Sequence, residues 1–234
     1  MQLHEWKEAV LEANLELVRR GLVIYTWGNV SAVDKERGLV IIKPRGIEYD
    51  QLTAEDMSVV DMDGRQVEGK LLPSVDLDYH LALYRSFEGL GGVAHTHSTC
   101  ATAFAQACVS IPVQGTTHAD HFFGDIPCLP YLPKAQVERD YERSAGQQIV
   151  QYFTENNIDP LSMGAVLCGG HGPFTWGKDA AAAVEHSVIL EELAHMALLT
   201  MQLNPHARLP EYMLDKHYLR KYGKNAYFYQ EKRS

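Results

Sequence analysis

The sequence predicts an α/β domain, because stretches typical of strands alternate with stretches typical of helices along the chain. Short runs rich in β-branched residues lie between turn residues, and longer segments carry apolar side chains at helical spacing. The 234-residue chain has no internal repeat, low-complexity segment or Pro/Gly/Ser-rich linker at which it would divide. We therefore expect one domain that spans residues 1–234.

The elements of the first half follow from apolar periodicity and from turn residues. Residues 3–20 carry apolar side chains at close to 3.6-residue spacing before Gly21, which indicates an amphipathic helix. The β-branched runs at 39–42 and 58–62 are bounded by turns that contain glycine or proline, and they predict strands. A helix is expected over residues 77–87.

The second half alternates in the same way. Residues 91–97 are expected to form a strand, and Ser98 is placed to cap a helix that runs to residue 107. Residues 109–133 form a long irregular stretch, a feature that is often functional in compact domains. The remaining expected elements are a helix over 138–155, a buried strand over 165–168 and an Ala/Glu/Leu-rich helix over 179–202.

Charge and composition narrow the class of partner. The formal net charge is −9, and no Lys/Arg cluster occurs before the last residues, so a nucleic-acid partner is not expected. No apolar stretch approaches the roughly 18 to 20 residues that span a bilayer, and the N-terminus lacks a signal pattern. We expect a cytoplasmic protein without a membrane partner. Without a Cys-x-x-Cys pair, buried free thiols are expected at Cys100, Cys108, Cys128 and Cys168.

Three histidines and one aspartate form a candidate metal site. His95 and His97 lie two residues apart on an expected strand, so their side chains share a face about 6.6 Å apart and can converge on one ion. His171 follows two glycines just past a buried strand, and glycines let a backbone approach a ligand closely. Asp76 precedes a helix and is either a fourth ligand or the N-cap. Such a donor set suits Zn²⁺.

Two other histidines are alternative candidates for metal ligands. His186 and His195 lie on the expected helix 179–202, where Glu192 and His195 have the Glu-x-x-His spacing of a di-iron bundle. That architecture needs two such motifs and further glutamates, and this motif occurs once. We therefore expect both histidines at the helix surface or at an interface.

Six motifs in order carry a resemblance to a known family. They lie at residues 25–31, 42–46, 95–97, 115–120, 171–177 and 214–220. The chain resembles the L-ribulose-5-phosphate 4-epimerases of the class II aldolase/epimerase family, nearly from end to end. The resemblance implies a three-layer α/β/α domain with a central, largely antiparallel sheet. It also implies a homotetramer with fourfold (C4) symmetry and active sites at subunit boundaries.

The resemblance also assigns roles to residues. As zinc ligands it implies the four residues found above, with Mn²⁺ as the alternative metal, and Asp76 favours an epimerase because the aldolases have Glu at this position. Asp120 is implied as an acid/base group contributed across the interface, beside His118. The implied substrate and phosphate site comprises Gly28, Asn29, Lys43, Arg45, Gly46, Ser74, Val75, Thr116 and His217.

The implied reaction is reversible retro-aldol cleavage of the C3–C4 bond of a small ketose or ketose phosphate, with zinc as a Lewis acid. Recombination after rotation of the bound aldehyde gives the C4 epimer and needs two proton carriers. Asp120 is one. The family tyrosine aligns with Phe228, which cannot transfer a proton, so Tyr229 is the preferred second carrier, and Tyr227, His217 or water are alternatives. The alternative function is an aldolase that releases its two fragments. A binding protein on the same scaffold is disfavoured by the retained Asp/His set.

Two departures from the family pattern bear on the substrate. Arg45 and Val75 each replace a serine of the family motifs. Val75 offers no hydrogen bond to a phosphate oxygen. Arg45 is either a phosphate partner or fills the pocket and contacts a neutral hydroxyl. We interpret the changes as a shift in specificity, with an unphosphorylated ketose such as fructose or tagatose as one outcome.

Overall fold

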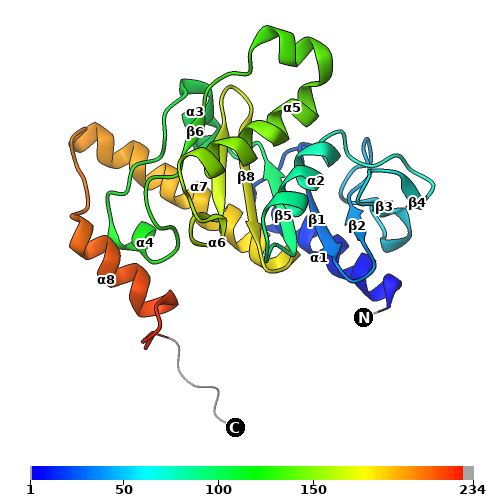
Figure 1. Cartoon of the computed structure of the whole chain (residues 1–234), viewed down its shortest axis with the longest axis horizontal. Coiled ribbons are helices and arrows are strands. Elements are labelled where there is room, and N and C mark those ends of the chain that lie inside the picture. Colours follow the sequence, from blue (N-terminus) through cyan, green and yellow to red (C-terminus); the bar gives the residue numbers. More distant parts are fainter. Residues whose placement is uncertain (1, 229–234) are drawn as a thin grey trace.

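The computed structural model describes residues 2–228, and within them eight strands form one twisted sheet (Figure 1). The strand order is β4-β3-β2-β1-β5-β8-β7-β6, and every neighbouring pair is antiparallel except β6 with β7. The strands are β1 (Gly28–Asp34), β2 (Leu39–Ile42), β3 (Ser58–Asp61), β4 (Gln66–Glu68), β5 (Gly92–Thr96), β6 (Cys128–Leu129), β7 (Ala165–Cys168) and β8 (Gly172–Gly177).

Helices cover both faces of this sheet. On one face α1 (Leu3–Arg19) packs against β1 and β2, and α7 (Ala180–Leu203) packs against β5 and β8. On the other face lie α2 (Leu77–Ser86) and α5 (Lys134–Glu155), which pack against each other (Figure 1). The expected three-layer α/β/α fold with a largely antiparallel sheet is therefore confirmed. The remaining helices are α3 (Thr99–Ala107), α4 (Thr116–Ala119), α6 (Pro160–Met163), α8 (Glu211–Tyr222) and a 3-10 turn (Ala54–Asp56).

The core holds two clusters, a smaller one beneath α1 and the first part of α7, and a larger one that lies beneath α2 and α5 and continues to α3 and the rest of α7. Along β1, Val30 and Ala32 point into the cluster beneath α1 and α7, whereas Val33 points into the cluster beneath α2 and α5. Neighbouring β5 repeats the alternation with Ala94 and Val93. Because successive strand residues face opposite sides, each central strand is buried on both faces and forms a rigid platform.

Most of the expected elements are present, with shifted ends. The expected helices 3–20, 77–87 and 179–202 correspond to α1, α2 and α7, and the expected strands correspond to β2, β3, β5 and β7. The expected helix 138–155 begins earlier, at Lys134, and contains a kink at Asp140. The sequence did not predict β1, β4, β8, α6 or α8, and the irregular stretch 109–133 contains α4 and β6.

Two local expectations need correction. Ser98 occupies the N-cap position of α3, but its side chain makes no capping hydrogen bond. All four thiols are free, yet of these Cys168 alone is buried, and Cys108 is exposed because it ends α3 in a left-handed conformation at the surface. Among the described residues, no helix is both long and apolar enough to cross a bilayer.

Candidate active site

A cavity of about 460 Å³ opens where β1 and β5 meet the loops that follow β2 and precede α2. Eleven of the residues that the sequence assigns to the site line this cavity, together with Thr26, Trp27 and Pro44. The eleven are Gly28, Asn29, Lys43, Arg45, Gly46, Ser74, Val75, Asp76, His95, His97 and His171.

Three of the lining residues form a histidine triad, defined here as His95, His97 and His171. One ring nitrogen from each lies within 4.8 Å of the others. Nε2 of His95 and Nε2 of His97 are 3.1 Å apart. The strand β5 ends at Thr96, so His97 lies just past it rather than on it. The triad has the nitrogen spacing that lets three imidazoles bind one ion.

His95 is held by the sheet and by its own ring contacts. It lies opposite Asn29 of β1 and Phe174 of β8 in the strand register. Its ring stacks on Phe174 with centroids 4.3 Å apart, and its Nδ1 lies 2.9 Å from the carbonyl of Pro173. A carbonyl accepts only, so Nδ1 carries the proton and donates it, which leaves the lone pair of Nε2 facing the triad.

His171 lies on the turn between β7 and β8. Gly170 before it has φ +72°, and a Cβ there would lie 2.2 Å from the ring of Tyr131, so this turn requires glycine. The hydroxyl of Tyr79 lies 3.4 Å from Nδ1 of His171, which leaves Nε2 for a ligand. Burial and the neighbouring His95 lower the pKa of His97 to about 4 and also lower the pKa of His171. Both rings are therefore neutral at pH 7, the form that binds metals.

Asp76, at the start of α2, lines the same cavity as the triad. It occupies the N-cap position but makes no capping hydrogen bond, so the capping interpretation is wrong. Instead its Oδ2 accepts a 2.7 Å hydrogen bond from Nδ2 of Asn29. Burial opposes its ionisation, but the neighbouring His95 and the hydrogen bond from Asn29 outweigh burial, and the pKa of Asp76 is lowered. Three imidazoles and one carboxylate would be a donor set that Zn²⁺ accepts.

Gly28 is required at the floor of the cavity. It has φ +125°, and a Cβ at this position would lie 2.8 Å from the carbonyl oxygen of His95. Only glycine combines this backbone conformation with so close an approach of β1 to β5. The sequence assigned Gly28 to the substrate site, and the structure adds this packing reason.

The cavity has a cationic end at the loop after β2. Lys43 is 2% exposed, its Nζ donates to the carbonyl of Ile47 at 3.1 Å, and it lies 4.7 Å from the centroid of the Tyr49 ring. Burial, partly opposed by Glu48, lowers the pKa of Lys43 to about 8. Arg45 is held across this loop because its Nε donates to the carbonyl of Pro73 at 3.1 Å.

The remaining site residues lie elsewhere in the chain. Asp120, at the end of α4, accepts hydrogen bonds from Nε and one terminal nitrogen of Arg220 at 3.0 and 2.7 Å, and its Oδ1 lies 3.2 Å from Nδ1 of His217. Burial would raise the pKa of Asp120, but these hydrogen bonds outweigh it and the pKa is lowered. Thr116 begins α4, and neither it nor the group of Asp120, His217 and Arg220 lines the cavity. The preferred second carrier, Tyr229, lies outside the described residues.

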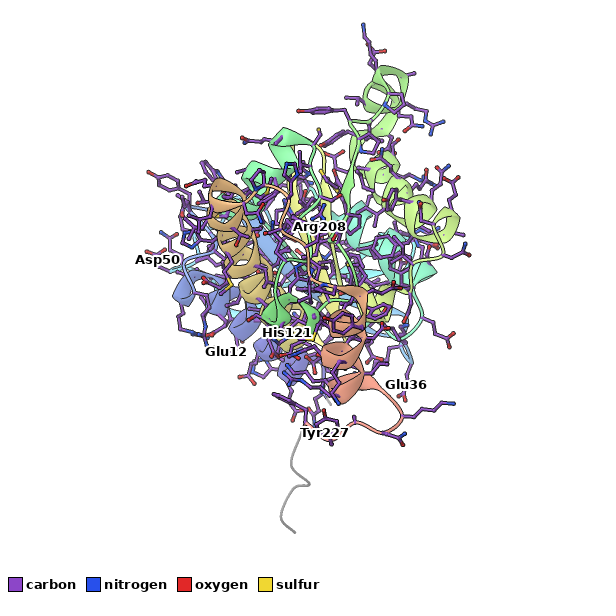
Figure 2. The ribbon with its side chains drawn as sticks, turned by 90° about the vertical axis from the view of Figure 1, so that its left-hand side faces the viewer. Glu12, Glu36, Asp50, His121, Arg208 and Tyr227 are labelled. Carbon is purple, nitrogen blue, oxygen red and sulfur yellow. The ribbon has the colours of Figure 1, made fainter. Side chains whose placement is uncertain are left out.

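The α4–α8 end of the molecule therefore holds a second group of polar residues (Figure 1). Figure 2 faces this end, and His121 beside α4 lies above Tyr227, which follows α8. Here the ring of Phe228 lies 5.1 Å from the guanidinium of Arg220. His118 is buried, and its Nε2 lies 2.9 Å from the carbonyl oxygen of Gly124, so this side chain helps to hold the loop after α4 in place.

Sequence reasoning missed Tyr79 and Arg220 as supporting residues. Arg220 ends the motif at 214–220, and Tyr79 lies one helical turn after Asp76. The sequence positions of both residues could therefore have indicated that they support the site. The competing histidines are not part of the triad. His195 is exposed on α7, and half-buried His186 contacts the carbonyl of Trp176.

Comparison with known proteins agrees with this geometry. The model of the Class II Aldolase and Adducin N-terminal domain family matches residues 8–198. The L-ribulose-5-phosphate 4-epimerase UlaF of Salmonella paratyphi B is 50% identical over 230 residues, which cover 98% of this chain and 100% of that protein. The protein of the same name from Salmonella typhi matches equally well. The resemblance seen in the sequence is therefore confirmed.

Two solved structures share the fold. An L-fuculose 1-phosphate aldolase superposes with a TM-score of 0.77 at 23% identity, over 91% of this chain and 94% of that chain. YgbL from Klebsiella pneumoniae superposes with a TM-score of 0.72 at 24% identity, over 92% of this chain and 99% of that chain. At such identities the likeness concerns the fold alone.

Proposed function

The chain belongs to the Class II Aldolase and Adducin N-terminal domain family, and on that premise we propose that it is a metal-dependent 4-epimerase of a small ketose phosphate, of the L-ribulose-5-phosphate 4-epimerase type. The observation that carries the proposal is the histidine triad in the same cavity as the buried Lys43. The 50% identity to the epimerase UlaF over nearly the whole chain supports the reaction class.

The metal would be held by the triad and by Asp76, with Zn²⁺ as the expected ion and Mn²⁺ as the alternative. Support comes from the donor set, from the single free nitrogen that its contacts leave on His95, and from the ionised carboxylate held by Asn29. When bound, such a cation supplies Lewis acidity toward the carbonyl and hydroxyl oxygens of a ketose.

Asn29 would orient the sugar. Its Nδ2 donates to Asp76 and, at 3.0 Å, to Oγ of Ser74. Its Oδ1 is buried and has no hydrogen-bond partner among the described residues. A buried acceptor without a donor is costly, so a substrate hydroxyl that donates to Oδ1 would recover that cost. This favours a polyol substrate at this point of the cavity.

Lys43 and Arg45 would bind the phosphate of the substrate. Both line the cavity, and Arg45 is already held at its rim by Pro73. The guanidinium of Arg45 and the ammonium of Lys43 attract phosphate oxygens, which offsets the hydrogen bond that is lost because Val75 has no hydroxyl. We therefore favour a phosphorylated ketose, and the shift to an unphosphorylated ketose becomes an outcome of the assay below.

The proton carriers would come from a neighbouring subunit. Asp120 is held as a carboxylate by Arg220 and His217, the form that accepts a proton, yet it does not line the cavity of its own protomer. A homotetramer with C4 symmetry that brings Asp120 and Tyr229 of one subunit to the cavity of the next would complete the site. The continuous sheet supports one domain over residues 1–234, and the free thiols fit a cytoplasmic location.

The test is an assay of metal-reconstituted protein on L-ribulose 5-phosphate beside L-ribulose, D-fructose and D-tagatose. We expect epimerisation of the phosphate ester, no accumulation of free aldehyde, and loss of turnover when the metal is removed by a chelator and when His97 is replaced by Asn. Turnover of free sugars alone would show that the phosphate assignment of Lys43 and Arg45 is wrong. Release of aldehyde fragments would favour the aldolase.

A further inference from the structure

The helix that follows the triad is capped from a distant helix. The first four backbone N–H groups of any helix have no partner within it, and a side chain at the N-cap normally accepts from one of them. Ser98 does not do so in α3. Instead Glu191 of α7 accepts from the backbone N–H of Cys100 at 2.7 Å through Oε1, and from that of Ala101 at 2.9 Å through Oε2.

The packing of α7 in the core holds Glu191 in its capping position. Glu191 lies 91 residues after Cys100 in the chain, and its own helix is fixed by the buried neighbours Leu190 and Leu193. A carboxylate at a helix N-terminus also interacts favourably with the helix dipole. The contact therefore sets where α3 begins relative to α7 and to the core.

The start of α3 matters because His97 lies directly before it. His95 is fixed by strand pairing, by the stacked Phe174 and by the carbonyl of Pro173. His97 is only partly exposed, follows the end of β5, and has no ring hydrogen bond among the described residues except its contact with Nε2 of His95. Its imidazole is therefore oriented chiefly by its backbone, which α3 holds on its C-terminal side.

We propose that Glu191 is a positioning residue of the metal centre, which directs the imidazole of His97 by holding the N-terminus of α3. This inference rests on the proposed function, because it presupposes that the triad binds a metal. Glu191 touches neither the metal nor the substrate. Its role is to restrict the orientation of the His97 ring, because His97 is the triad histidine without a hydrogen-bond partner outside the triad among the described residues.

The test is titration of metal-stripped protein with Co²⁺, which replaces Zn²⁺ and reports its coordination through visible absorption bands. Glu191→Ala removes both acceptors, and we expect Co²⁺ affinity to fall at least about tenfold, with altered bands. Glu191→Gln keeps one carbonyl oxygen and should lose less. Glu192→Ala is the matched control, because Glu192 is the next residue of α7 and is exposed, and it should bind Co²⁺ as the wild type does.

Thermal unfolding of each metal-free variant separates positioning from stability. A folded Glu191→Ala protein that binds Co²⁺ with wild-type affinity and bands would overturn the inference, whatever its melting temperature. If Glu191→Ala does not fold, Glu191→Gln decides, and wild-type affinity in that variant overturns the inference equally. Failure of the wild type to bind Co²⁺ would instead overturn the proposed metal centre and this inference with it.

Discussion

At the scale of single residues, one or two neighbours decide the chemical state of each site residue. The carbonyl of Pro173 accepts a hydrogen bond from Nδ1 of His95, the neighbouring His95 and then the hydrogen bond from Asn29 lower the pKa of Asp76, and burial lowers the pKa of Lys43. The type of amino acid does not determine these states by itself, because each state depends on the neighbouring polar groups and on the degree of burial.

Lys43 predicts a pH dependence. Its lowered pKa of about 8 means that the ammonium is present below pH 8 and is lost above it, within the range of an ordinary assay. We therefore expect kcat/KM for the ketose phosphate to fall as the pH rises through about 8. Lys43→Met should have a lower kcat/KM and should lack this decline. A wild-type profile that stays flat from pH 7 to 9 would mean that Lys43 does not contact the phosphate.

Gly28 predicts a stability effect. Gly28→Ala places a Cβ 2.8 Å from the carbonyl of His95 in a backbone conformation that alanine rarely adopts. We expect a loss of about 2 kcal/mol or more in the free energy of unfolding, measured by urea denaturation at fixed protein concentration. The control is Gly115→Ala, whose Cβ would meet no atom within 4 Å and whose φ is −146°. That variant should stay within about 1 kcal/mol of the wild type, and equal losses in both variants would contradict the argument.

At the scale of elements, the sequence did not predict β1 and β8, the two strands that pair with β5 beside the site. β1 has the sequence GNVSAVD and β8 has the sequence GPFTWG, so neither has a β-branched run. Both are nevertheless buried, because each has hydrogen-bonded strands on both sides. Glycine and small polar residues weaken the local preference for a strand, but they let backbones and ligands approach.

The pairing of α4 with α8 depends on Asp120 and Arg220. Replacing Arg220 by Gln removes a two-point hydrogen bond, so we expect faster backbone hydrogen exchange in α8 and a higher pKa of Asp120, because the principal contact that lowers it is lost. Exchange measured by mass spectrometry and titration of Asp120 by NMR test both effects.

The matched control for that variant is Arg208→Gln. Arg208 precedes α8 on the same side of the molecule (Figure 2), and its nearest carboxylate oxygen, on Asp125, is 3.8 Å away with both side chains largely exposed. A weak exposed pair contributes little, so exchange in α8 should be unchanged. If both variants speed exchange equally, the Asp120 contact is not what holds α8.

At the scale of the whole molecule, the site residues fall into two separate groups in one chain. The histidine triad lies where β5 ends and just before β8 begins, whereas Asp120 and His217 lie on the α4 and α8 segments, which Figure 1 shows at one end of the molecule. If adjoining subunits unite the two groups, two inactive variants should complement each other. Co-expression of His97→Asn with Asp120→Asn should restore about a quarter of wild-type activity in a mixed cyclic tetramer. Each variant expressed alone should be inactive. An inactive mixture would place both groups in the site of one subunit, and activity of Asp120→Asn on its own would exclude Asp120 from the reaction.

The sequence by itself determined the alternation of helices and strands, the three histidines, and the residues that meet in the cavity. These are local signals, because apolar spacing and motifs of three to seven residues do not depend on distant contacts. Only the tertiary structure decided that Glu191 rather than Ser98 caps α3, that Arg220 holds Asp120, and that Lys43 is buried enough to lower its pKa. The two hydrogen-bonded pairs join residues that are 91 and 100 positions apart, and burial is a property of the packed molecule. Such contacts exist only once the layers are assembled, so no local pattern can predict them.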